Sequence, residues 1–223
     1  MIITKTPYRI SFFGGGSDYP SWYIKNGGMV LSTTINKFVY ISCRNLPPFF
    51  KHKYRIVWSK LETVKKIHEI NHKPIRKMLD YYKIKNGLEI HYDGDLPARS
   101  GMGSSSSFVV GLLNLLNHME NKKISKKQLA ISSINLEQNI LKENVGSQDQ
   151  IATSYGGFNS IKFFKNGKFK VYNICKDNIF LKNLNNNLFL YYTDINRTAQ
   201  KVADTYVGSL TSAKKKEIKT ILS

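Results

Sequence analysis

Residues 95–108 read DLPARSGMGSSSSF and lie between an alternating segment, residues 88–93, and an apolar stretch, residues 104–119. The alternation predicts a half-buried strand, and the apolar stretch predicts a helix. Glycines at positions 101 and 103 let backbone N–H groups approach an anion without an intervening Cβ. The following helix would begin with unpaired N–H groups, which favour a phosphate. This stretch therefore predicts a phosphate-binding loop between a strand and a helix, with a flexible connection as the plainer alternative.

The loop differs from two common phosphate-binding motifs. No Lys-Ser or Lys-Thr pair ends it, as in a Walker A loop, and Ser106 occupies the last glycine position of a GxGxxG fingerprint. The hydroxyls of residues 104–107 offer further donors or a ligand for magnesium. The sequence therefore predicts a phosphate site of another type.

Outward from the loop, the chain predicts a mixture of strands and helices in one α+β fold. Asn166-Gly167 is a strong hairpin turn signal, and Ser125 is a good helix N-cap. We expect strands at residues 2–13, 29–44 and 188–193, a hairpin at 158–175, and helices at 61–70, 74–84, 104–119 and 125–142.

The composition is that of a folded protein. The 223 residues are 41% hydrophobic and 12% aromatic, which is unlike a disordered chain. Cys43 and Cys175 lie far apart outside any CxxC pattern, which argues against a disulfide framework or a zinc site. The N-terminus lacks the regions of a secretory signal, and no apolar run reaches the about 18 residues of a membrane span. We therefore expect a cytoplasmic protein with no membrane contact.

The formal net charge of +19 has three interpretations. Clustered Lys and Arg would neutralise a nucleic-acid backbone, whereas scattered charges form a solvated surface or attract small phosphorylated substrates. The positive residues are scattered, and the chain has no Arg-rich stripe or aromatic RNA-binding motif. We therefore favour a solvated surface and expect no nucleic-acid partner.

Two acidic residues stand out by their positions. Glu137 shares a helical stripe with Ala130, Ile134 and Leu141, where a carboxylate is costly unless it is paired or bound to metal. Asp149 lies near a predicted helix start, where the helix dipole alone would favour an acid. A surface glutamate and a first-turn aspartate are the plainer interpretations.

A glycine-rich segment near the N-terminus, residues 14–20, reads GGGSDYP. Its three glycines allow close backbone approach to a ligand. Asp18 would then hydrogen-bond hydroxyl groups, whereas in a plain glycine turn it would cap a helix.

The loop residues resemble the P-x-x-x-G-L-G-S-S motif of the GHMP kinases, the family of galactokinase and of homoserine, mevalonate and phosphomevalonate kinases. Met102 replaces the usual leucine. In that family the loop surrounds the nucleotide phosphates, and a loop serine together with a glutamate holds Mg²⁺. The resemblance therefore implies ATP and Mg²⁺, with Ser104, Ser105 and Glu137 on the metal. It assigns ATP binding to Pro97, Arg99, Ser100, Gly101, Met102, Gly103, Ser104, Ser105 and Ser106.

Two further segments resemble the same family. Pro7-Tyr8-Arg9 is similar to its first motif, which implies that Arg9 stabilises the transferred phosphoryl group; the family's catalytic aspartate corresponds to Asp149. The GGGSDYP segment is similar to the signature of family members that phosphorylate the anomeric hydroxyl of D-glycero-D-manno-heptose 7-phosphate. The implied substrate contacts are Gly15, Gly16, Ser17, Asp18, Tyr19, Arg197 and Thr198.

The resemblance implies a ribosomal protein S5 domain 2-like N-terminal domain, residues 1–180, for ATP and sugar binding. Residues 181–223 would be the incomplete start of a ferredoxin-like C-terminal domain. The implied reaction is ATP-dependent phosphorylation of a small-molecule sugar phosphate at C1, and a homodimer stays open as an assembly. The alternatives are a fucokinase- or galactokinase-like enzyme, an ATP-binding fragment without turnover, and a basic nucleic-acid-binding module.

Overall fold

The computed structural model describes residues 1–98, 100–174 and 177–191. Its strands are β1 (Ile2–Phe13), β2 (Gly28–Asn45), β3 (Tyr54–Val57), β4 (Leu61–Val64), β5 (Leu88–Gly94), β6 (Phe158–Phe163) and β7 (Phe169–Asn173). Its α-helices are α1 (Pro20–Asn26), α2 (Lys73–Tyr81), α3 (Ser104–Met119), α4 (Lys126–Asn135), α5 (Gln148–Tyr155) and α6 (Asn178–Asn186). A short 3₁₀ turn, η1 (Ile67–Glu69), and a π-helical turn, η2 (Leu136–Ile140), complete the described elements.

One mixed sheet carries the fold, in the order β4-β3-β5-β2-β6-β7, with β1 paired to β2. The long strand β2 pairs antiparallel with β1 from Leu31 to Cys43. It also pairs with β6 through residues 28–33 and with β5 through residues 39–45. The strand β2 therefore connects the two ends of the sheet.

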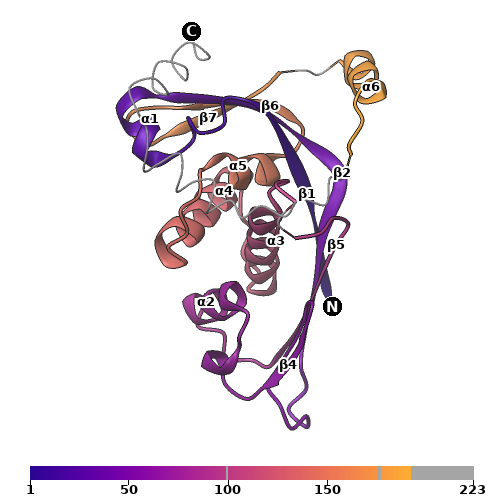
Figure 1. Cartoon of the computed structure of the whole chain (residues 1–223). Coiled ribbons are helices and arrows are strands. Elements are labelled where there is room, and N and C mark those ends of the chain that lie inside the picture. Colours follow the sequence, from indigo (N-terminus) through magenta and orange to yellow (C-terminus); the bar gives the residue numbers. More distant parts are fainter. Residues whose placement is uncertain (99, 175–176, 192–223) are drawn as a thin grey trace.

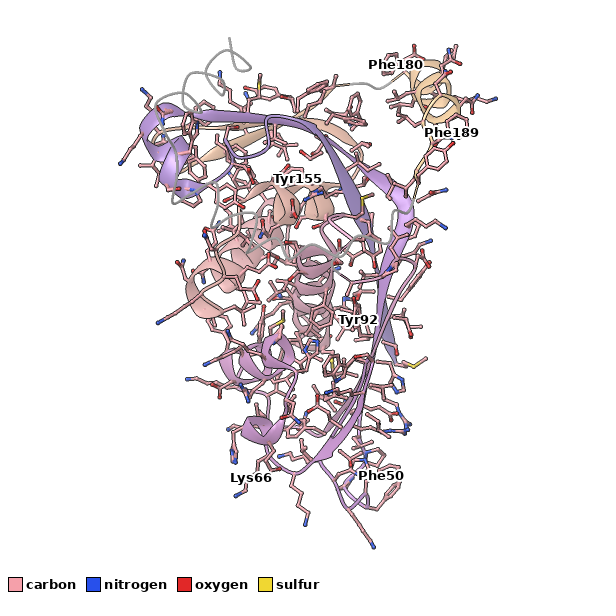
Figure 2. All side chains as sticks on the ribbon, in the orientation of Figure 1. Phe50, Lys66, Tyr92, Tyr155, Phe180 and Phe189 are labelled. Carbon is pink, nitrogen blue, oxygen red and sulfur yellow. The ribbon has the colours of Figure 1, made fainter. Side chains whose placement is uncertain are left out.

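Helices α2, α3, α4 and α5 lie on one side of the sheet (Figure 1). The buried residues of α3 pack against inward positions of the sheet, such as Tyr8, Ile41 and Ile90. Tyr92 of β5 points toward the same side, with its ring 4.9 Å from that of Phe108 in α3 (Figure 2). We call the opposite side of β1, β2, β3 and β5 the outer face; no helix among the described residues packs over it.

Helix α6 differs from the other helices because none of its residues is buried. Phe180 is 48% exposed, and Phe189, just beyond the helix, is 77% exposed. Figure 2 shows these two side chains together, apart from the rest of the fold. Within the described residues, no helix combines the length and apolarity needed to cross a membrane.

Most of the expected elements are confirmed. The strand at residues 2–13, the long strand at 29–44 and the helix at 104–119 all form, and β6 and β7 form the hairpin expected at 158–175, of which residue 175 lies outside the described residues. Ser125 caps α4 in a reciprocal capping box with Gln128. The division of the chain at residues 180 and 181 stays a prediction.

Two expected elements are wrong. Residues 61–70 form β4 and the 3₁₀ turn instead of a helix, because β4 pairs with β3 and buries Glu62. The Glu62 carboxylate accepts hydrogen bonds from the backbone N–H groups of Asn71 and His72 and from Trp58 Nε1. Residues 188–191, expected in a strand, are irregular. The strands β3 and β4 and the helices α1 and α6 were not expected.

Candidate active site

The glycine-serine loop leads directly into α3 and is held against β1. Gly101 and Gly103 both have φ of +75°, a left-handed conformation that L side chains rarely adopt. The backbone N–H of Arg9 donates to the carbonyl oxygen of Met102 at 3.1 Å. The Ser107 hydroxyl donates to the carbonyl oxygen of Pro7 at 2.9 Å. The loop is therefore fixed in position beside β1.

The Arg9 side chain links this loop to α5. Its Nε and Nη2 atoms donate to Oδ1 and Oδ2 of Asp149 at 2.7 and 2.8 Å, and its Nη1 donates to the carbonyl oxygen of Gly101 at 2.9 Å. Burial would lower the pKa of Arg9, but the Asp149 carboxylate raises it above its ordinary value. Bidentate pairs of this kind fix orientation as well as charge. The loop, Arg9 and Asp149 are thus joined by hydrogen bonds into one unit.

Asp18 joins the GGGSDYP segment to the start of α5. Its Oδ1 accepts from the backbone N–H of Gly16 at 3.0 Å, and its Oδ2 accepts from that of Gln148 at 3.1 Å. A Cβ at Gly146 would lie only 1.9 Å from Asp18 Oδ2, so glycine is required there. Burial, followed by repulsion from Asp149, raises the pKa of Asp18 to about 6. In this structure Asp18 positions α5, and its contact with substrate stays a prediction.

Ser17 and Tyr19 flank Asp18 differently. Ser17 is fully buried, and its hydroxyl lies within hydrogen-bond distance of the carbonyl oxygens of Gly14, at 2.7 Å, and Met29, at 3.1 Å. Tyr19 is half-buried; burial and the nearby charges of Asp18 and Asp149 raise its pKa to about 12. The phenol of Tyr19 is thus close to the Arg9–Asp149 pair, whereas Ser17 fixes the glycine segment to β2.

Glu137 is fully buried in the π-helical turn η2 beneath the start of α3. Its carboxylate accepts from the hydroxyls of Ser105 at 3.1 Å and Ser106 at 2.7 Å, and from the side-chain amide of Gln150. Burial raises its pKa to about 7. Short π-helical turns occur often at functional sites. Here the turn brings a carboxylate against the loop serines.

The oxygen atoms of Glu137 and of the loop serines fit the magnesium ion that the sequence predicts. Mg²⁺ prefers oxygen ligands and is held by one or two carboxylates together with substrate phosphates and water. Glu137 and the hydroxyls beside it supply such oxygens, and no Lys or Arg side chain among the described residues pairs with Glu137. The described residues contain no group of three or more His, Cys, Asp or Glu that could hold a metal ion. A Mg²⁺ ion on Glu137 would need further oxygen ligands, such as those of phosphate groups and water.

The structure brings together most of the residues expected in the site from separate parts of the chain. Arg9, Asp18, Glu137 and Asp149 all lie around the loop, although Ser106, rather than Ser104, joins Ser105 on Glu137. Pro97 and Ser100 precede the loop, while Arg99, Arg197 and Thr198 lie outside the described residues.

Sequence reasoning missed two glutamines that flank Asp149. Gln150 is fully buried and donates to Glu137, and its Oε1 has no partner among the described residues. Gln148 has a buried, unpartnered Oε1 as well, and its amide lies beside Gly15. In the sequence, the only signal was that a glutamine stands on each side of Asp149 in the run QDQ. Their importance is visible in the structure, where buried polar atoms without partners are rare.

The fold and this site define the class. Residues 64–157 match the model of the GHMP kinases N terminal domain, and the chain carries that domain, as the sequence resemblance predicted. Over 236 aligned positions the chain is 28% identical to D-glycero-alpha-D-manno-heptose 7-phosphate kinase of Campylobacter jejuni subsp. jejuni serotype O:2. The alignment covers 97% of this chain and 66% of that protein. It is 28% identical over 165 residues to galactokinase of Pyrococcus furiosus, covering 73% and 46%.

A solved structure has the same fold. The crystal structure of a D-glycero-D-manno-heptose 1-phosphate kinase from Bacteroides thetaiotaomicron superposes with a TM-score of 0.73 at 22% identity, covering 82% of this chain and 62% of that one. This confirms the expected fold class of the N-terminal region. The chain spans less than two thirds of the length of these relatives.

Proposed function

We propose that the chain is an ATP-dependent sugar kinase that transfers the γ-phosphoryl group to an anomeric hydroxyl. One observation carries the proposal: Arg9 holds Asp149 by a bidentate pair and hydrogen-bonds the carbonyl oxygen of Gly101 in the same loop. A phosphate on the loop and a hydroxyl at Asp149 would then be neighbours. Phosphoryl transfer requires chiefly such positioning and charge stabilisation.

Each group has a distinct role in this reaction. Asp149 orients the sugar hydroxyl and accepts its proton, and Arg9 stabilises negative charge on the transferred group. The backbone of Gly101, Met102 and Gly103 holds the nucleotide phosphates at the start of α3. Glu137 with the loop serines would hold Mg²⁺, which neutralises phosphate charge when it is bound.

For the substrate we propose D-glycero-D-manno-heptose 7-phosphate, with the 1,7-bisphosphate as product for nucleotide-heptose and surface polysaccharide synthesis. The proposal is supported by the GGGSDYP segment and by the heptose 7-phosphate kinase of Campylobacter jejuni, whose similarity, at 28% identity, extends over 97% of this chain. Residues 1–180 would bind ATP and sugar, and residues 181–223 would begin a second domain in which Arg197 and Thr198 hold the substrate's own phosphate.

The test is ADP release by the 223-residue chain with ATP, Mg²⁺ and a panel of sugars. We expect turnover with the heptose 7-phosphate and its loss in Asp149→Asn, which keeps the shape of the side chain but removes its charge. Retained ATP binding by Asp149→Asn, measured by thermal shift, would show that the variant is folded. If the unmodified chain releases ADP no faster than Asp149→Asn, catalysis by this chain is rejected, and the chain would be an ATP-binding domain without turnover.

A galactokinase-like activity is the second candidate. It is favoured by the similarity to galactokinases of Pyrococcus furiosus and Lactococcus lactis, which are 28% and 25% identical over the matched residues. Galactose and fucose therefore belong in the panel. Phosphorylation of either without phosphorylation of the heptose would overturn the proposed substrate and keep the sugar kinase.

A further inference from the structure

Three charged side chains form one row across the outer face. Arg44 of β2 and Glu89 of β5 are partners in the antiparallel register, and Arg55 of β3 is the partner of Glu89 in the parallel register. Side chains alternate between the faces of a strand, and the neighbours Cys43, Ile56 and Ile90 point into the core. Arg44, Glu89 and Arg55 therefore all project from the outer face.

Glu89 is the centre of this row. Its side chain is almost buried and accepts from Arg44 Nε at 2.8 Å, Arg55 Nη1 at 3.1 Å and His91 Nε2 at 2.8 Å. The hydrogen bonds from His91 and Arg44 lower the pKa of Glu89, so the carboxylate is ionised at neutral pH. We call Arg44, Arg55, Glu89 and His91 the outer-face cluster. One carboxylate thus orients three donor side chains.

The cluster carries more positive charge than Glu89 offsets. Two guanidinium groups face one carboxylate, so its net charge is positive even with His91 neutral. The Arg44 and Arg55 side chains are 48% and 41% exposed. Arg44 Nη1 and the Nε and Nη2 atoms of Arg55 have no hydrogen-bond partner among the described residues.

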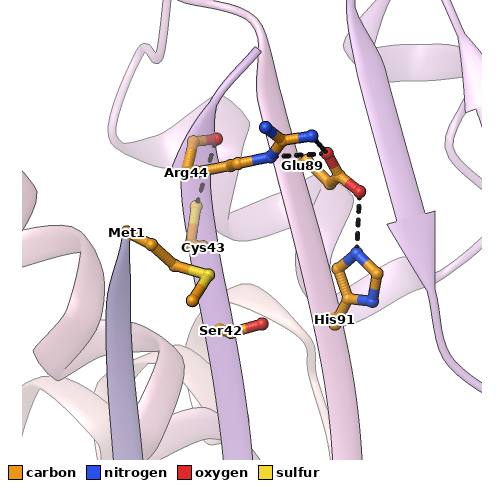
Figure 3. Close-up of a pocket in the computed structure, with 6 residues that line it drawn as sticks. All are labelled: Met1, Ser42, Cys43, Arg44, Glu89 and His91. Carbon is orange, nitrogen blue, oxygen red and sulfur yellow. Dashed lines mark hydrogen bonds and ion pairs between the residues drawn. The ribbon is translucent and has the colours of Figure 1, made fainter.

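Arg44, Glu89 and His91 of the cluster border a pocket, and Arg55 lies outside its lining. Met1, Ser42, Cys43, Arg44, Glu89 and His91 line an open hollow of about 230 Å³ (Figure 3). Figure 3 shows Arg44 and His91 converging on Glu89 from two strands. Cys43 lines the hollow although its side chain belongs to the core, where burial raises the pKa of its thiol to about 12. The pocket offers guanidinium, imidazole and hydroxyl donors and lies on the opposite side of the sheet from α3.

We propose that the outer-face cluster binds the phosphate group of a small anionic metabolite, at a site separate from the glycine-serine loop. Guanidinium groups match phosphate oxygens bidentately, and here Glu89 holds both of them in place before a ligand arrives. Preorganisation of this kind lowers the cost of ordering long side chains on binding. The proposal does not depend on the kinase activity, because none of these residues belongs to the candidate active site.

The experiment titrates pyrophosphate, as the probe, into the ¹⁵N-labelled 223-residue chain and follows backbone amide shifts by NMR. We expect saturable shifts at residues 42–44, 54–56 and 89–91, besides any at residues 101–107. Arg55→Met keeps Arg44 and His91 on Glu89, and it should weaken the outer-face affinity about tenfold without altering the shifts at residues 101–107. Location separates the two sites, so failure of one proposal is distinguishable from failure of the other.

Lys85→Met is the matched control, because it removes one positive charge from an exposed residue outside the cluster. We expect its outer-face affinity to equal that of the unmodified chain. Equal weakening by Lys85→Met and Arg55→Met would reduce the effect to general charge attraction and overturn the proposal. Shifts confined to residues 101–107 would overturn it as well. So would a response of the outer face to a short single-stranded RNA but not to pyrophosphate.

Discussion

At the scale of single residues, the Arg9–Asp149 pair restricts the carboxylate to one orientation. A lysine at position 9 would keep the charge but could not donate to both Asp149 oxygens and to the Gly101 carbonyl together. We therefore expect Arg9→Lys to lower kcat by about 10- to 100-fold, with a smaller change in KM for ATP. Steady-state kinetics measure both, and an unchanged kcat would show that orientation by Arg9 is dispensable.

Asp18 makes the stability of the fold depend on pH. Its pKa is raised from 3.8 to about 6, so between these values the folded protein holds a proton that the unfolded chain has released. The free energy of unfolding should therefore fall as pH rises from about 4 to 6, by up to about 3 kcal/mol from this group. Urea denaturation of Asp18→Asn across this range should show a flatter curve, whereas parallel curves would contradict the raised pKa.

The side chain of Gln148 carries a hydrogen-bond acceptor that has no partner among the described residues. Because its Oε1 is buried without a hydrogen bond among the described residues, and its amide lies beside Gly15, we expect it to accept from a sugar hydroxyl. Gln148→Leu should raise the KM for sugar about tenfold and leave the KM for ATP unchanged. A parallel rise in both KM values would indicate a general disturbance of α5.

At the scale of the loop, Gly101 and Gly103 provide a matched pair. Both have φ of +75°, so alanine at either should cost about 1–2 kcal/mol of stability. Only at Gly103 would the new Cβ meet other groups, Arg9 Cγ at 3.2 Å and Asp149 Oδ2 at 3.3 Å. We therefore expect Gly103→Ala to lower kcat much more than Gly101→Ala does. Equal kcat values for the two variants would indicate that Arg9 and Asp149 take no part in the reaction.

Elements with strong local patterns were predictable from the sequence, and those set by distant partners were not. The apolar stretch of α3 and the capping box of α4 contain their own signals. Residues 61–64 were predicted as helix because nothing local reveals β3, the strand that pairs with them. Tertiary pairing outweighs local propensity in such short segments.

At the scale of the whole molecule, the core lies on one side of the sheet. Ile41 is fully buried beneath α3, whereas Ile3 on the outer face is 59% exposed. We expect Ile41→Ala to cost about 2–5 kcal/mol and Ile3→Ala to change stability by less than about 0.5 kcal/mol. Chemical denaturation distinguishes them, and a comparable loss from Ile3→Ala would mean that the outer face is covered in solution.

The two sites differ in how much the sequence reveals of them. Arg9 belongs to a segment that resembles a family motif, whereas Glu137 and Asp149 were assigned from their helix positions and by correspondence with the family. The structure places all three around one loop. The outer-face cluster has no motif, since Arg55 and Glu89 meet only through the register of β3 and β5. Register depends on the whole sheet, which local patterns do not specify.

The strand β2 pairs with β1, β5 and β6, and this arrangement has a consequence during synthesis on the ribosome. Its partners β1 and β5 are translated close to it in the sequence, but β6 begins at Phe158, after β2 has ended at Asn45. At roughly 5–20 residues per second, the edge at residues 28–33 would wait on the order of 10 s for its partner. During that interval the nascent chain presents an unpaired strand edge, which is the type of surface that chaperones protect from aggregation.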